Sequence, residues 1–193
     1  YDIESDMNII MQQAQYLSKT IDDFRNFIKN TKEAQKLSLK DTIEKTLSIL
    51  HSAMVNNSTN IIIDLKDDMC IDGYENELIQ SFINIINNSK DAIKEYVKND
   101  EKLIFINTIK EDSSLIITIK DNGGGISDNI IHRIFEPYFT TKNKNVGTGI
   151  GLSMTYKMIT ERNNASIDVY NEEYTYDNKN YKGACFKITF KTT

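Results

Sequence analysis

Apolar residues recur in steps of four and three along the first thirty positions, a period of 3.5 that is typical of helices packed in a bundle. The positions are Ile3, Met7, Ile10, Ala14, Leu17, Ile21, Phe24 and Ile28. No Gly or Pro interrupts them, so we expect a long bundle helix in a first unit, residues 1–36, whose apolar seam needs partner helices. The alternative is an amphipathic helix that lies on its own domain.

Beyond residue 36 the period of the apolar positions changes from segment to segment. Ser38 with Asp41 three residues later predicts a capped helix. We predict helices over about 39–56, 74–98 and 150–162, and strands over about 60–66, 102–110, 114–121, 165–170 and 184–191. Because the predicted strands and helices do not alternate regularly along the chain, their order favours an α+β fold. In such a fold, a two-layer sandwich, helices cover a mixed sheet.

The composition is that of an ordinary globular protein and restricts the partners. Of 193 residues, 39% are hydrophobic and 26% charged, and the net charge of −5 argues against a nucleic-acid surface. Cys70 and Cys185 form no CxxC pair, so we expect two reduced thiols in the cytosol. No apolar run approaches the roughly 18 residues of a membrane span, so we expect no membrane contact. The first residue is Tyr1, so we expect a piece of a longer protein.

A polar stripe crosses the predicted helix 74–98. Asn84, Asn88 and Asp91 fall within about 60° of one another at 100° per residue. Their oxygens could hold a hard cation such as Mg²⁺, which takes a few protein oxygens together with phosphate and water. Plain exposure to solvent explains the stripe equally well.

Two glycine-rich stretches hold six of the eight glycines. In the first, Asp121 ends a predicted strand and precedes Gly123 and Gly125, so its carboxylate could accept a hydrogen bond from the amine of a flat ring. A tight turn would explain this stretch as well. The second, "VGTGIGLS", precedes a helix and fits an anion site, although it matches neither of the two common phosphate loops.

The segment "IFEPYFTTKNKN" lies between the two glycine stretches and contains the chain's one proline, Pro137. Three aromatic residues give it an apolar foot, and a polar stretch follows over 140–145. A lid over a nucleotide, with Lys142 reaching the phosphates, fits this setting better than an ordinary surface loop.

In this order and spacing, these motifs resemble the ATP-binding domain of sensor histidine kinases. "NIINN" resembles the N box of that family, "DNGGG" its first glycine box, "FEPYFTTK" its F box, "GTGIGLS" its second glycine box and "GACFKITF" its closing strand. The resemblance covers about 38–191 and implies a Bergerat-type (GHKL) ATP-binding fold for residues 37–193. It implies ATP or ADP, with Mg²⁺, as the ligands.

The resemblance also implies roles for individual residues. Asn88, and less surely Asn84, would bind Mg²⁺, and Asp121 would accept from the adenine amine. Many relatives have a phosphate-binding Lys where this chain has Asp91, and we expect Lys142 rather than Lys90 to replace it. The complete nucleotide set is Asn84, Asn88, Asp91, Asp121, Gly123, Gly125, Ile126, Tyr138, Lys142, Gly147, Thr148, Gly149, Gly151, Leu152 and Thr189.

The first helix is similar to the second helix of the dimerising histidine-phosphotransfer bundle of that family. The resemblance therefore implies a homodimer, a response regulator receiver domain as partner, and phosphoryl transfer to a histidine. Neither His51 nor His132 has the surroundings of that acceptor, so we expect it outside this sequence. The alternatives are a GHKL-type ATPase, in which a Glu would stand at the position of Asn84, and a silent ATP-binding module.

Overall fold

The computed structural model describes Met7, Met11, Ala14 and residues 33–66, 70–98, 100–142 and 147–191. Most of the predicted bundle helix lies outside these residues. Met7 and Ala14, two positions of the predicted seam, are helical and exposed to solvent. In the described part of the chain, no helix combines the length and the apolar character needed to cross a bilayer.

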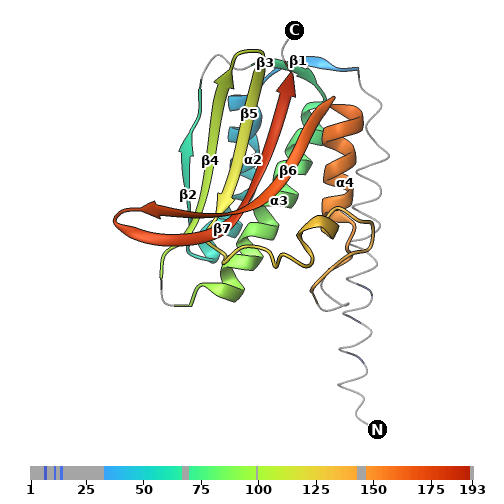
Figure 1. Cartoon of the computed structure of the whole chain (residues 1–193). Helices are drawn as coiled ribbons and strands as arrows, with labels where there is room; N and C mark the ends of the chain where they lie inside the picture. Colours follow the sequence, from blue (N-terminus) through green and yellow to red (C-terminus); the bar gives the residue numbers. More distant parts are fainter. Residues whose placement is uncertain are drawn as a thin grey trace.

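A five-stranded mixed sheet forms one layer (Figure 1). In spatial order its strands are β2 (Thr59–Asp64), β4 (Lys102–Glu111), β5 (Ser114–Asp121), β7 (Lys179–Lys191) and β6 (Ala165–Tyr176). β2 is parallel to β4, and every other neighbouring pair is antiparallel. The predicted mixed sheet is confirmed.

Three helices cover one face of this sheet: α2 (Leu39–Asn56), α3 (Glu75–Tyr96) and α4 (Gly151–Lys157) (Figure 1). The backbone N–H of Asp41 donates to Ser38 Oγ, which confirms the predicted cap of α2. α4 continues into a π-helical turn, η2 (Met158–Arg162), so the two together match the predicted helix 150–162. A short 3₁₀ turn, η1 (Ile131–Arg133), precedes the lid segment.

Two short strands form a separate antiparallel ribbon that the sequence did not predict. They are β1 (Gln35–Ser38) and β3 (Cys70–Gly73), and they place the start of α2 beside the start of α3. Four residues are too few to establish a period of two, so the apolar pattern carried no signal for them.

The last two strands are longer than predicted and form one continuous hairpin. The predicted strands 165–170 and 184–191 become residues 165–176 and 179–191, joined through Asp177 and Asn178. Both turn residues have positive φ, 48° and 59°, the geometry of a tight two-residue hairpin turn. Most of the polar residues between the two predicted strands are therefore strand as well.

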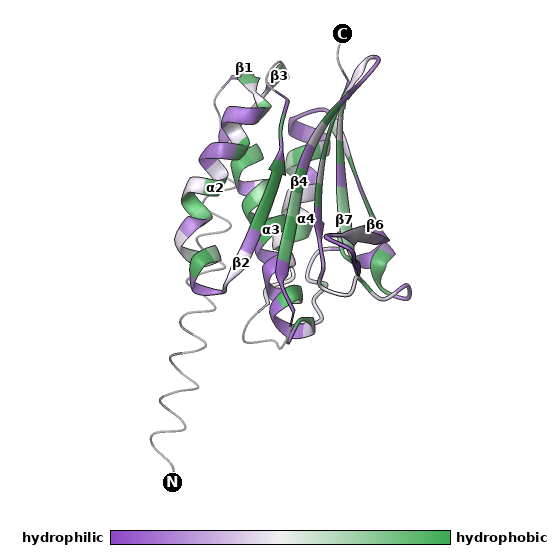
Figure 2. Ribbon diagram, turned by 90° about the vertical axis from the view of Figure 1, so that its left-hand side faces the viewer, coloured by the Kyte–Doolittle hydropathy of each residue, from purple (hydrophilic) through white to green (hydrophobic). Residues whose placement is uncertain are grey.

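The core lies between the sheet and the helices. Ile104 and Ile106 of β4 and Ile117 and Ile119 of β5 point to the helical side, because alternate residues of a strand face the same way. The helices contribute buried residues that include Leu39, Ile43, Leu78, Phe82, Ile85 and Ile86. Figure 2 shows the corresponding apolar stretches on the strands and the mixed surfaces of the helices.

A second apolar cluster covers the opposite face of the sheet. Leu103 and Phe105 of β4 lie there with Tyr181, where the far end of the β6–β7 hairpin curls across the sheet (Figure 1). The rings of Phe105 and Tyr174 meet edge to face at 5.5 Å, and the Lys120 ammonium lies 4.0 Å from the centre of the Tyr174 ring. The hairpin is thereby fixed on the outer face.

Candidate functional site

The polar stripe of α3 faces the start of α4 and the lid segment. Asn84, Asn88 and Asp91 are partly exposed, while the opposite side of the helix is buried in the core. An amphipathic helix whose polar side faces other protein segments, rather than open solvent alone, is consistent with a binding role.

Asn84 ties α3 to α4. Its amide Nδ2 donates to the main-chain oxygen of Gly151 and to Thr155 Oγ1, both at 3.2 Å. Its Oδ1 accepts a hydrogen bond from Gln80 Nε2 at 3.1 Å. The side-chain oxygen is already engaged, so Asn84 acts here as a contact between helices.

Lys142 reaches from the lid segment to the other end of the stripe. Its ammonium lies 3.2 Å from Asn88 Oδ1 and 2.6 Å from Asp91 Oδ2. Lys90, the neighbouring lysine on α3, donates instead to Asn87 Oδ1 at 3.0 Å and lies 3.8 Å from Asp91 Oδ1. The structure therefore brings together Asn88, Asp91 and Lys142.

Asp121 ends β5 on the helical side of the sheet, and only 2% of its surface is exposed. Its Oδ1 accepts hydrogen bonds from the backbone N–H groups of Gly123 at 2.8 Å and Ala184 at 3.2 Å. Burial raises the pKa of the carboxyl group, and this outweighs the lowering by these two bonds and by the nearby hydroxyl of Ser89. Ser89 Oγ is itself buried beside this carboxyl group.

The loop after Asp121 is pressed against α3. A Cβ atom at Gly123 would lie 2.9 Å from Ala92 Cβ and 3.0 Å from the backbone of Ile93, so a larger residue would push the loop away. Gly125 lies against the side chain of Asn171, which accepts from Ile126 N at 2.7 Å and donates to Ile126 O at 2.6 Å. The loop is held from both sides.

The second glycine stretch packs on the foot of the lid. Gly149 has φ +66°, and an added Cβ would overlap the backbone of Tyr138, which donates its N–H to Gly149 O at 2.9 Å. Tyr138 itself has φ 66° and a 78% exposed side chain. A Cβ at Gly147 would meet Thr140 Oγ1 at 2.5 Å. The loop and the lid foot therefore form one joined surface.

Four further residues of the predicted nucleotide set have different structural positions. Thr148 Oγ1 accepts from Ile150 N at 3.2 Å and shapes the glycine loop. Ile126 and Leu152 are partly buried and pack against the edge of the core. Gly151 begins α4, where a Cβ would meet only Asn84 Cγ at an ordinary 3.9 Å.

Thr189, which was predicted to belong to the nucleotide set, lies apart from this group. It pairs with Ile116 and Ser166 in the middle of the sheet. It lies five residues from Ala184 along β7, roughly 17 Å at the rise of a strand. Its neighbours Ile188 and Phe190 face the core, so its own side chain points to the opposite face.

Several residues that support the site were not predicted from the sequence. Ala184 and Ser89 contact the carboxyl group of Asp121, and Asn171 fixes Ile126. A Cβ at Gly183 would overlap the main-chain oxygen of Asp121, so β7 passes very close to the end of β5. The motif "GACF" contained two of these residues, whereas Asn171 lay just beyond the predicted strand 165–170.

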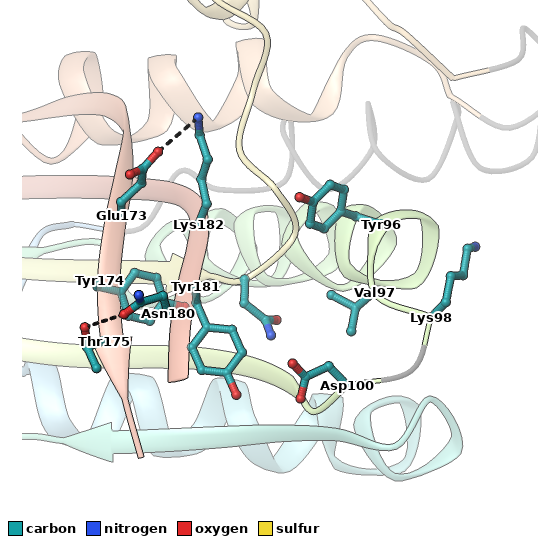
Figure 3. Close-up of a pocket in the computed structure, with 11 residues that line it drawn as sticks. Tyr96, Val97, Lys98, Asp100, Glu173, Tyr174, Thr175, Asn180, Tyr181 and Lys182 are labelled. Atoms are coloured by element: carbon teal, nitrogen blue, oxygen red, sulfur yellow. Dashed lines mark hydrogen bonds and ion pairs between the residues drawn. The ribbon is translucent and has the colours of Figure 1, made fainter. Parts of the chain in front are cut away.

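A cavity of about 680 Å³ lies on the far side of the loop that follows Asp121, between the end of α3 and the β6–β7 hairpin (Figure 3). Tyr96, Asn122, Tyr174 and Tyr181 are among its lining residues, and none of the predicted site residues lines it. One hydrogen bond links a lining residue to the site: Tyr174 Oη donates to the main-chain oxygen of Asp121 at 3.0 Å. The cavity is therefore behind the candidate site and separate from it.

Comparisons with known proteins identify the domain. A family model described as histidine kinase-, DNA gyrase B-, and HSP90-like ATPase matches residues 73–193. The chain belongs to this family. It carries the ATP-binding domain of the histidine-kinase type, and its homologues are sensor histidine kinases.

Two curated relatives are much longer than the part that matches this chain. Sporulation kinase A of Bacillus subtilis (strain 168) is 34% identical over 155 residues, 80% of this chain and 23% of that protein. The signal transduction histidine-protein kinase AtoS of Escherichia coli (strain K12) is 30% identical over 156 residues, 79% of this chain and 24% of that protein. The chain thus spans about a quarter of the length of these relatives.

Solved structures confirm the α+β fold. The nucleotide-free catalytic domain of histidine kinase ThkA is similar with a TM-score of 0.67 and 20% identity, over 84% of this chain and 97% of that chain. ThkA in complex with the response regulator protein TrrA gives a TM-score of 0.69 and 18% identity, over 100% of this chain and 52% of that chain.

Proposed function

We propose that this domain transfers the γ-phosphoryl group of ATP to a histidine on a bundle helix outside the sequence, for onward transfer to the receiver domain of a response regulator. The observation that carries the proposal is the presence of an amide at position 84 and the hydrogen bonds that this amide makes. At the position where the hydrolytic branches of the fold have a Glu, this chain has an amide whose groups bind Gln80, Gly151 and Thr155. An amide cannot take a proton from water at neutral pH, so Asn84 cannot serve as the base for hydrolysis.

Phosphoryl transfer asks less of this domain than hydrolysis does. It needs the nucleotide to be positioned and its charge neutralised, while the nucleophile comes from elsewhere. In our proposal Asp121 accepts from the adenine amine, the two glycine loops lie along the nucleotide, and Lys142 contacts the phosphates. Tyr138, in the foot of the lid, covers the nucleotide.

The residues present fit a magnesium ion. Asn88 and Asp91 offer hard oxygen donors, and both contact one positively charged group, the Lys142 ammonium, in the structure. When bound, Mg²⁺ would neutralise phosphate charge next to these side chains. Asn84 is less suited than we expected from the sequence, because its oxygen already accepts a hydrogen bond.

The remaining parts of the proposal concern the longer protein. Residues 1–36 would form the second helix of a dimerising bundle, and the domain would start at residue 37. Met7 and Ala14, exposed and helical, agree with a surface that has a partner helix in the dimer. We propose a cytoplasmic location for this domain, with no contact to nucleic acid or membrane.

The test supplies the acceptor on a separate chain. The bundle of the longer protein, with its acceptor histidine, is mixed with this domain and Mg·ATP, and acid-labile phosphohistidine is measured. We expect transfer to the bundle, none to a bundle whose acceptor is changed to Gln, and at least a tenfold loss with Asn88→Ala. ATP that binds without any labelled bundle would contradict the transferase proposal, and rapid release of free phosphate would favour a hydrolase.

A further inference from the structure

We infer that Asn88 and Asp91 form the cation site of this domain and that the ammonium of Lys142 occupies it until Mg²⁺ arrives with the nucleotide. The inference rests on the proposed function, which gives Mg²⁺ to Asn88 and Asp91. It goes beyond that function by making Lys142 a competitor of the metal.

The geometry of the site is that of a bound cation. Asn88 and Asp91 are three residues apart on α3, so their side chains lie on one side of the helix. Both oxygens lie within 3.2 Å of the same ammonium, which comes from a segment more than 50 positions away in the chain. One carboxylate and one amide oxygen converging on a positive charge suit Mg²⁺, which usually keeps several waters and takes few protein ligands.

Lys142 can leave this position at little cost. Its side chain is 36% exposed and that of Asp91 is 40% exposed, and ion pairs in such surroundings contribute little to stability. A hydrated Mg²⁺ carries twice the charge of the ammonium and also binds the phosphates of the nucleotide. The metal and nucleotide together therefore displace the lysine.

Asn84 does not compete for this role. Its oxygen accepts from Gln80, and its amide nitrogen donates to the first turn of α4. Turning this side chain to a metal would break three hydrogen bonds between and within the helices, whereas Asp91 gives up only contacts to lysines.

Displacement gives Lys142 a second position. Once it leaves Asp91, the Lys142 ammonium is free for the phosphate contact that the proposed function gives it. Binding of the metal and release of Lys142 from Asp91 then become one event.

The experiment measures the affinity for ADP by calorimetry with Mg²⁺ and with EDTA, and compares the ratio between variants. Wild type should bind at least tenfold more tightly with Mg²⁺. Asp91→Asn should lower this ratio at least fivefold without weakening binding in EDTA. Lys142→Met should weaken binding in EDTA, where the lysine is the remaining phosphate partner, and keep or raise the ratio.

Two controls match these changes. Asp112→Asn makes the same change of charge in the exposed turn between β4 and β5, where Asn suits the positive φ of 43°. Lys94→Met removes an exposed lysine near the end of the same helix. Both should keep the wild-type ratio. A normal ratio in Asp91→Asn, or an equal loss of ratio in Lys142→Met, would overturn the inference.

A second measurement separates this inference from the proposed function. Binding of Mn²⁺ alone is followed by electron paramagnetic resonance, in the absence of nucleotide. We expect tighter Mn²⁺ binding in Lys142→Met, where the competitor is removed, and weaker binding in Asp91→Asn. Mn²⁺ binding that is the same in all variants would contradict the cation site, whereas a wild type that binds no ADP under either condition would contradict the proposed function.

Discussion

The carboxyl group of Asp121 is buried at the end of β5, and burial raises its pKa above the ordinary value. A group whose pKa is higher in the folded chain than in the unfolded chain binds protons preferentially in the folded state. Its favourable contribution is complete below the unfolded pKa and is lost as the pH rises through the folded pKa. At neutral pH the charge therefore opposes folding, which is consistent with a side chain kept for a ligand.

Asp121→Asn should remove this opposition and also remove the proposed acceptor of the adenine amine. Asn can still accept from Gly123 and Ala184 through Oδ1, so the loop keeps its bonds. We expect the variant to unfold at a higher urea concentration than wild type at pH 7.5, with a difference that shrinks toward pH 4. ADP affinity should fall at least tenfold. A variant that is less stable at neutral pH, or binds ADP normally, would contradict this assignment.

Gly183 and Gly151 allow a direct comparison of two glycines. A Cβ at position 183 would overlap the main-chain oxygen of Asp121, so Gly183→Ala must separate β5 from β7 at that point. We expect a loss of at least about 3 kcal/mol in the free energy of unfolding. Gly151→Ala, whose Cβ meets an atom only at 3.9 Å, should change it by no more than about 1 kcal/mol. Chemical denaturation of both variants checks this, and similar values would contradict the reported closeness of the strands.

At the scale of the elements, the Asn84 side chain makes two hydrogen bonds from α3 to α4. Asn84→Ala removes the two bonds to α4 and leaves the main-chain oxygen of Gly151 with one fewer partner. We expect a loss of about 1–2 kcal/mol in stability. Backbone amides of α4 should exchange faster with deuterium than in wild type, while those of β4 should not. If the Mg²⁺ dependence of ADP binding disappears instead, with exchange in α4 unchanged, Asn84 is a metal ligand and not a helix contact.

The elements with a strong periodic pattern were predictable from the sequence, and those fixed by distant contacts were not. The predicted helix 39–56 matches α2, and its start could be predicted because the cap formed by Ser38 and the backbone of Asp41 is local. β1 and β3 exist only because each pairs with the other across about thirty residues of chain. The far part of the β6–β7 hairpin is polar in sequence and is held by aromatic contacts on the outer face.

The same distinction applies to the site. Asn88 and Asp91 are on one helix, so their common side could be inferred from the helical period alone. The contact with Lys142, and the role of Asn171 behind Ile126, depend on how separate segments pack. The position of Thr189 away from Asp121 likewise depends on the alternation of β7, which turns its side chain to the opposite face of the sheet.

At the scale of the whole molecule, the two faces of the sheet have different tasks. The helical face holds the core and the candidate site, where the end of β5, the polar side of α3 and the lid segment meet. The outer face carries the curled hairpin and the cavity behind the site (Figure 3). Tyr174 spans the boundary, since its hydroxyl bonds to Asp121 and its ring packs on Phe105.

The bond network of Asn84 also bears on how this chain could change its chemistry during evolution. To make this chain a hydrolase, a glutamate would be needed at position 84, which is a change of few nucleotides in the gene. A carboxylate there has no N–H to offer Gly151, and the Thr155 hydroxyl already donates to Gly151 O. The new base would face a carbonyl oxygen and loosen α4, so a substitution at position 84 alone would not give a water-activating site unless the first turn of α4 changed as well.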